Sequence, residues 1–166
     1  MTKKTFIPAL SLTVFIACAT VVAVLFSTAK RERNGQLALT VQATPGDVSR
    51  LSLLLKNGSQ RPITIYQESL PWDSPYAILL VGIVSHVEEQ PLHILPGPID
   101  DPTDKNVTLK PGDELRGEIQ IDQRLSGFTQ ALSRGDVLLF WSYQPLGPGP
   151  DLPREGGWLV LPGTRR

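Results

Sequence analysis

A long uncharged segment near the N-terminus constrains this chain more than any other feature. Residues 5–29 form 25 consecutive positions without Asp, Glu, Lys, Arg or His. A helix rises about 1.5 Å per residue, so such a segment is long enough to cross a hydrocarbon core about 30 Å thick. The sequence therefore predicts an N-terminal transmembrane anchor over residues 1–29, a linker over 30–35 and a β domain over 36–166.

Two alternatives to a permanent anchor stay open. A cleaved signal peptide would end near Ala17-Cys18-Ala19, which has the small-x-small form of a cleavage site. The apolar run 21–26 continues beyond that site and favours the longer helix. A lipoprotein would carry its lipid on Cys18, but the bulky Phe15 before it and the apolar residues after it do not fit that pattern. We expect residues 5–29 to hold the chain in the membrane.

The flanks of this segment give little information on its orientation, because Lys3 and Lys4 nearly balance the basic residues at 30–33. The short N-terminal tail resembles that of a signal-anchor in a bacterial inner-membrane protein. Asn57-Gly58-Ser59 and Asn106-Val107-Thr108 have the form of glycosylation triplets. Both observations favour a single-pass protein of the cell membrane whose domain is periplasmic or extracellular.

The charges and the cysteine count narrow the classes of partner. The chain has 16 basic and 16 acidic residues, for a net charge of zero, and they are interspersed. Nucleic acid is therefore not an expected partner, because binding it requires a basic stripe or patch. Cys18 is the only cysteine, so the domain cannot form an internal disulfide.

Short apolar runs separated by turn signals follow the linker and predict a chain of β-strands. The expected strands are 37–41, 51–55, 63–66, 77–84, 107–109, 115–121, 137–143 and 158–161. The run 77–84 is almost continuously apolar and suits a central strand, and 137–143 suits a core strand. In 115–121 apolar and charged residues alternate, which predicts a sheet with one wet side.

Glycine and proline predict where the strands end. We expect a turn at Asn57-Gly58 and a type II turn at residues 110–113, where proline precedes glycine. Loops are expected at 71–75, 90–105 and 144–157, and a helical turn around Leu125, Phe128 and Leu132. These elements predict an all-β, immunoglobulin-like antiparallel β-sandwich behind one transmembrane helix, with a barrel as the alternative.

The order of four of these pieces resembles a known family. They are Leu53-Leu54-Leu55-Lys56-Asn57, Ile63-Thr64-Ile65, the run from Val107 to Asp113, and Gly135-Asp136-Val137-Leu138-Leu139. This pattern resembles the N-terminal β-domain of deuterolysin-type metallopeptidases and, more loosely, small bacterial proteinase-inhibitor sandwiches. The resemblance implies a sandwich fold. It implies no catalysis, because a family peptidase needs a His-Glu-x-x-His helix and this chain has only His86 and His93.

Polar clusters that could hold a metal are better explained as solvated loops. His86, Glu88, Glu89 and His93 include ordinary zinc ligands, but the domain has no third histidine or cysteine to complete a site. Asp100, Asp101, Asp104 and Asn106 lack the spacing of an EF-hand. No motif brings a serine nucleophile and a base together. We expect no cofactor, no metal and no enzymatic activity.

Exposed aromatic residues give the best candidates for a binding surface, because they anchor partners as well as filling cores. Trp141 is expected in the core, whereas Trp72 stands in a loop. The predicted partner-binding surface contains Trp72, Asp73, Tyr76 and Leu146.

These observations favour a non-enzymatic, membrane-tethered binding or assembly module of the cell envelope with a protein partner. The alternatives are a peptidase-inhibitor or peptidase-associated domain and, last, a secreted small hydrolase.

Overall fold

The computed structural model of the chain describes residues 37–85, 91–97 and 105–164. All of them belong to one compact unit, Asn34–Arg166. The expected membrane segment 5–29 and linker 30–35 lie outside the described residues, so they stay predictions. Within the described ranges no helix is both long and apolar enough to cross a membrane.

Antiparallel strands make up about half of the described residues. The eight strands are β1 (Leu37–Thr44), β2 (Asp47–Asn57), β3 (Ile63–Tyr66), β4 (Ile78–Val84), β5 (Asn106–Leu109), β6 (Glu114–Gln120), β7 (Val137–Tyr143) and β8 (Glu155–Leu161). The helical elements are two 3-10 turns, η1 (Gln67–Ser69) and η2 (Ile121–Gln123), and the helix α2 (Phe128–Arg134). The all-β prediction is confirmed, and each expected strand is found within a few residues of its expected bounds.

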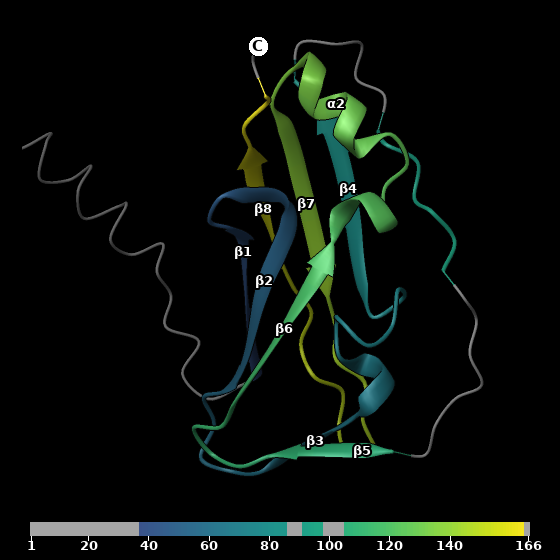
Figure 1. The fold of residues 1–166 in the computed structure, drawn as a ribbon. Helices are drawn as coiled ribbons and strands as arrows, with labels where there is room; N and C mark the ends of the chain where they lie inside the picture. The colour runs from purple at the N-terminus through teal and green to yellow at the C-terminus, as the bar shows by residue number, and fades with distance from the viewer. Residues whose placement is uncertain (1–36, 86–90, 98–104, 165–166) are drawn as a thin grey trace, which may run out of the picture. The chain divides into compact units, whose positions relative to one another are not determined.

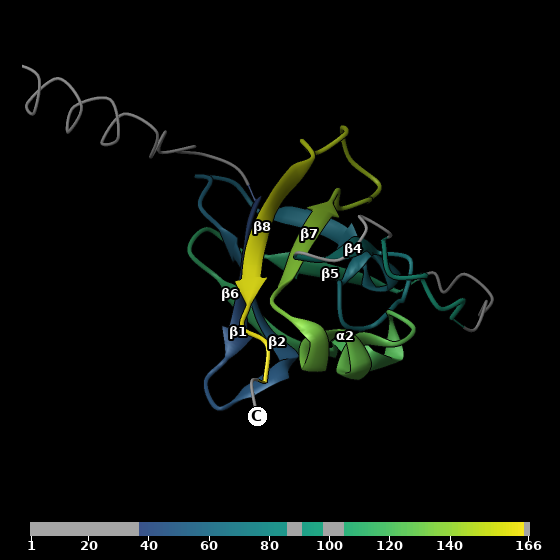
Figure 2. The ribbon, with the colours of Figure 1, turned by 90° about the horizontal axis from the view of Figure 1, so that it is seen from above.

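The strands form two larger sheets and one small one (Figure 1). One sheet has the order β1-β2-β6, the second has the order β4-β7-β8, and β3 pairs with β5. Every pairing is antiparallel. The first two sheets lie in separate layers, and β1 contacts β8 along one side (Figure 2). On that side the Leu39 backbone N–H of β1 donates to a Glu155 carboxylate oxygen of β8 at 2.8 Å.

One hydrophobic core fills the space between the two layers. Leu51 and Leu55 of β2 point inward, as do Val137 and Leu139 of β7, and all four are fully buried. Fully burying an aliphatic side chain contributes about 1.5–3 kcal/mol. The predicted helical turn is α2, which lies beside one end of β4 and β7 (Figure 1) and adds Phe128 to the same core.

The predicted type II turn between β5 and β6 is confirmed. Gly112 has a φ of 84°, and the Asp113 N–H donates to the Lys110 carbonyl at 3.0 Å. Glycine is favoured there because the left-handed region is costly for residues that carry a Cβ.

The predicted turn at Asn57-Gly58 depends on a side chain rather than on a simple hairpin. Asn57 ends β2 and is completely buried, and its side-chain oxygen accepts the Ser59 N–H at 2.9 Å. The strands on either side do not pair with each other, because β2 lies between β1 and β6 while β3 pairs with β5. The burial also corrects the interpretation of Asn57-Gly58-Ser59 as a glycosylation triplet, because its amide is inaccessible in the folded domain.

The expectation that 77–84 forms a central strand is wrong. Residues 78–84 form β4, but β4 stands at the edge of its sheet and β7 occupies the centre. Part of the β4 edge is covered by the following segment, where the Leu92 N–H donates to the Gly82 carbonyl at 2.7 Å. An apolar run does not fix the position of a strand in its sheet: alternate residues of β4 face the core, while the others, such as Leu79, lie on the outer side.

Candidate binding surface

The structure turns Trp72 toward the body of the domain. Its ring lies over Gly117 of β6, where a Cβ would overlap the indole. Trp72 is half-buried and packs against the core. The absence of a side chain at Gly117 leaves a space that the indole fills, so Trp72 is only partly exposed, and its role in partner binding stays a prediction. Trp141 of β7, which was expected in the core, is half-buried and packs against the core.

The other predicted surface residues are exposed but have different surroundings. Asp73 is exposed, and Tyr76 is 61% exposed while its hydroxyl donates to the Gly97 carbonyl at 2.8 Å. Leu146 is 58% exposed. Its backbone is held between the Ser69 hydroxyl, at 3.0 Å, and the Tyr66 N–H, at 2.9 Å. Tyr76 and Leu146 thus remain candidates for a partner-binding surface, and each is held in place by hydrogen bonds to a different part of the fold.

The polar clusters considered for metal binding are only partly within the described residues. His86, Glu88, Glu89 and the aspartates at 100, 101 and 104 lie outside them. His93 is exposed, and its carbonyl accepts the Ser126 N–H at 2.8 Å. In the part of the chain that the structure describes, no three His, Cys, Asp or Glu side chains group as metal ligands.

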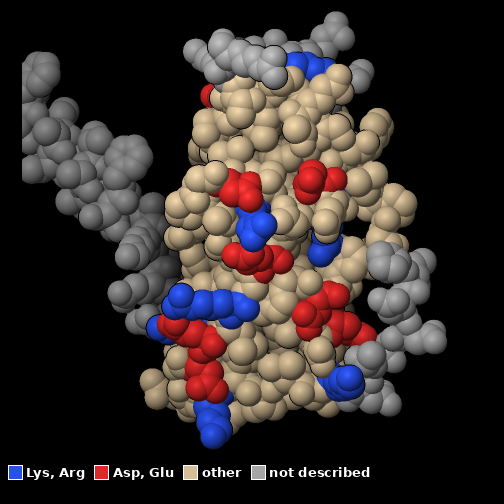
Figure 3. All heavy atoms as spheres, in the orientation of Figure 1, with Lys and Arg blue, Asp and Glu red and all other residues tan. Residues whose placement is uncertain are grey.

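The outer side of the β1-β2-β6 sheet carries ion pairs. This agrees with the prediction that one side of the sheet is exposed to solvent. Lys56 of β2 pairs with Glu114 of β6 at 3.0 Å, and Arg50 pairs with Glu118 at the same distance. We call this side the charged face. The hydrogen bond from Lys56 and its charge hold the pKa of Glu114 below its ordinary value. Acidic and basic side chains stand close together over the side of the molecule seen in Figure 3.

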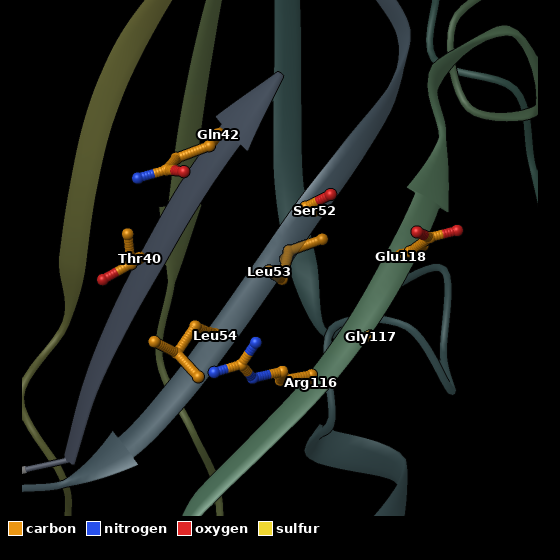
Figure 4. A pocket seen from close by; sticks show the side chains of 8 residues that line it. All are labelled: Thr40, Gln42, Ser52, Leu53, Leu54, Arg116, Gly117 and Glu118. Carbon is orange, nitrogen blue, oxygen red and sulfur yellow. The ribbon is translucent and has the colours of Figure 1, made fainter. Parts of the chain in front are cut away.

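A shallow hollow of about 450 Å³ lies on the charged face (Figure 4). Two cross-strand rows form its floor, since Thr40 pairs with Leu54 and Leu54 with Arg116, while Gln42 pairs with Ser52 and Ser52 with Glu118. Five of its eight lining residues carry hydroxyl, amide or charged groups, and Leu54 adds an outward-facing apolar side chain. None of the lining residues is aromatic, so the hollow offers a partner no aromatic anchor.

The outer side of the β4-β7-β8 sheet has the opposite character. Its nine outward positions form three cross-strand rows: Ile83 with Leu138 and Val160, Val81 with Phe140 and Trp158, and Leu79 with Ser142 and Gly156. None of these residues is charged. We call the seven large members the apolar face: Leu79, Val81, Ile83, Leu138, Phe140, Trp158 and Val160.

Large parts of the apolar face are open to solvent. Trp158 is 62% exposed, Leu79 and Val160 are each 50% exposed, and Phe140 is 47% exposed. The other three members are half-buried. A half-exposed large side chain presents on the order of 100 Å², so the face presents roughly 400–500 Å². An apolar patch of this size on a soluble surface commonly marks an interaction site.

Apolar surface continues from this face over the edge of β4. A groove there is lined by Pro75, Tyr76, Ile78, Leu79, Leu80, Ile94, Leu95 and Arg124. Leu79 belongs to both the groove and the apolar face, so the predicted residue Tyr76 lies beside the face. Desolvation lowers the pKa of the Arg124 guanidinium at this groove from its usual value, although arginine remains charged at neutral pH.

The apolar runs around Leu79 and Phe140 predict a central and a core strand, so neither residue was expected at the surface, and Val160 was expected only as part of the final strand. A usable signal was present. A two-layer sandwich buries only one side of each sheet, so a strand that is apolar at every position must expose half of its side chains unless something covers them. Strand β7 follows this rule: Leu139 is buried, whereas its neighbours Leu138 and Phe140 lie on the outer side.

Comparison with known proteins adds no functional assignment to these surfaces. Neither models of known protein families nor curated protein sequences match this chain. The resemblance to the deuterolysin-type β-domain, and the peptidase-inhibitor role it suggests, therefore stay predictions.

Proposed function

We propose that this chain is a non-enzymatic binding or assembly module of the cell envelope. Residues 5–29 tether it to the membrane, and residues 36–166 form an immunoglobulin-like sandwich on the periplasmic or extracellular side. The sandwich contacts a protein partner through the apolar face. The single observation that carries this proposal is the difference between the two outer sides of the domain, one lined by ion pairs and the other by uncharged side chains.

Exposed apolar area favours binding because its removal from water contributes about 25 cal/mol per Å². The arrangement of the face also suits a protein interface. Phe140 stands in the central row on the central strand, and Trp158 is its cross-strand neighbour. Aromatic side chains near the centre of an interface commonly contribute most of its affinity, while smaller apolar neighbours exclude water. Val81 completes that row on the other side of Phe140.

Photocrosslinking of the full chain in its native cells tests the binding surface. Trp158 is replaced by a photoreactive phenylalanine analogue, and the matched control carries the same analogue at Thr40 on the charged face. Both positions lie on exposed strand surfaces. We expect a protein adduct of defined mass from position 158 and none from position 40. Equal adducts from both positions, or none from either, would contradict a binding role for the apolar face.

Membrane fractionation tests the tether separately. The full chain should remain in the membrane pellet after an alkaline carbonate wash, whereas a chain starting at Asn34 should be released. A full chain that is washed off the membrane would rule out the anchor and leave the cleaved form as the better interpretation of residues 1–29.

A further inference from the structure

From the rows of the apolar face we infer that its occupant is a second copy of this chain, packed face to face across a two-fold axis. This inference rests on the proposed function, because it names the partner of the same surface. The shape of the apolar face, its lack of charge and its area all favour this occupant.

The two ends of the apolar face differ in size. At one end the row is Ile83, Leu138 and Val160, three branched side chains. At the other end Leu79 is followed by Ser142 and Gly156, which leave a low area beside Trp158. The face therefore has a raised end and a lowered end along the direction of the strands.

The two copies are related by a two-fold axis that is parallel to the sheet and perpendicular to the strands. This axis reverses the strand direction of the second copy, so the row that contains Leu138 in one copy lies over the row that contains Ser142 in the other. On β7 and β8 a large side chain of one copy then covers a small residue of the other, Leu138 over Ser142 and Val160 over Gly156. The central row lies over its own symmetry mate, which places Phe140 against Phe140 and Trp158 against Trp158 of the other copy. Isologous contacts of this kind require one surface that is complementary to itself, and apolar sheet faces pack at close to this aligned geometry.

Charge favours a second copy over a lipid surface. No outward position of the face is charged, so two identical faces meet without repulsion between like charges. Docking of a domain on an anionic bilayer depends on a basic rim, whereas this chain has equal numbers of basic and acidic residues and a net charge of zero.

The area of the face suits a weak dimer. With roughly 400–500 Å² presented by each copy, a pair buries about 800–1,000 Å² in total, near the lower limit for a specific interface. We therefore expect association in the micromolar range for the free domain and nearly complete pairing for copies tethered in one membrane, where effective concentrations reach the millimolar range.

Sedimentation equilibrium of residues 34–166 tests this inference. The unit has its own hydrophobic core, so it is suitable for study in isolation. We expect the average mass to rise from one copy toward two between about 1 µM and 500 µM protein. Phe140→Asp should weaken the association at least 100-fold, because it places a charge in the apolar centre. The matched control, Thr40→Asp, introduces the same charged residue on the charged face and should leave the association unchanged.

The difference in side-chain size between the two ends of the apolar face gives a more specific test of the two-fold arrangement. Ser142→Leu raises the lowered end without adding charge, so it should weaken association at least tenfold even though it adds apolar area. Combining it with Leu138→Ser exchanges the two ends and should restore most of the loss. If the double variant does not recover its association, the proposed two-fold arrangement is overturned. A wild-type domain that stays monomeric up to 500 µM would overturn the dimer itself.

Two further results separate this inference from the proposed function. An adduct from position 158 at twice the chain mass supports the second copy, while an adduct with another protein overturns it and leaves the binding module intact. Flotation of the monomeric domain with vesicles of phosphatidylethanolamine and phosphatidylglycerol, lost in Phe140→Asp, would overturn both the second copy and the protein partner in favour of lipid.

Discussion

Replacement of Asn57 by alanine should strongly destabilise the domain, because it removes a buried set of hydrogen bonds. The side-chain amide donates to the Leu109 carbonyl at 2.9 Å and to the Arg61 carbonyl at 2.8 Å. Its oxygen accepts from the backbone and the hydroxyl of Ser59. One buried side chain therefore connects the end of β2 to the end of β5 and to the bend between β2 and β3.

The magnitude follows from which partners water can reach. Leu109 is 1% exposed, so its carbonyl loses a bond that water cannot replace, at a cost of about 1–3 kcal/mol. Ser59 and Arg61 lie at a more open bend and add about 1 kcal/mol. The expected loss in the free energy of unfolding is about 2–4 kcal/mol, a large fraction of the 5–15 kcal/mol typical of a domain.

Urea unfolding of residues 34–166, followed by tryptophan fluorescence, measures this loss. Asn106→Ala is the matched control, because Asn106 is an exposed asparagine in β5 and should change stability by less than about 0.5 kcal/mol. Asn57→Asp keeps the acceptor but replaces the donor with a carboxylate that faces two carbonyl oxygens. Its cost at pH 7 should therefore equal or exceed that of alanine. Stability of either Asn57 variant equal to that of Asn106→Ala would refute the reasoning.

Three other substitutions test separate features of the fold. Gly117→Ala should lower the free energy of unfolding in urea by about 1–3 kcal/mol, because a Cβ would overlap the Trp72 ring. Gly149→Ala is the control, because a Cβ at Gly149 meets nothing within 4 Å. Equal stability of the two variants would argue against the Trp72 contact. Gly112→Ala should lower stability by about 1 kcal/mol, because φ is +84° in the turn before β6, and an unchanged unfolding midpoint would contradict that conformation. The pKa of Glu114 is lowered by Lys56, so its stabilising contribution is present above the unfolded-state pKa and disappears as the pH falls through the folded-state pKa. Lys56→Met should raise the Glu114 pKa toward its ordinary value in an NMR titration, and an unchanged pKa would exclude this pairing in solution.

Much of the secondary structure could be predicted from the sequence because its signals are local. Strand β1 alternates between buried and exposed positions from Leu37 onward, and this period of two is visible in the sequence. The turn before β6 needs only proline and glycine in the right order, because those residues restrict or permit particular backbone angles by themselves.

The candidate surface could not be predicted in the same way. The sequence drew attention to Trp72 because it stands between prolines and polar residues, but the exposure of its ring depends on Gly117, which is distant in the sequence. Phe140 appeared to be a core residue because its neighbours are apolar. Its exposure depends on whether another layer covers the outer side of β7, and no local pattern records that.

The sequence by itself determined the uncharged N-terminal segment, the all-β character and the positions of most strands and turns. Only the tertiary structure decided that β4 lies at a sheet edge, that Asn57 is buried and that one outer side of the domain is charged while the other is apolar. The physical reason is that backbone preference and alternation depend on adjacent residues. Burial depends on which layers meet, and that is set by contacts between segments far apart in the chain.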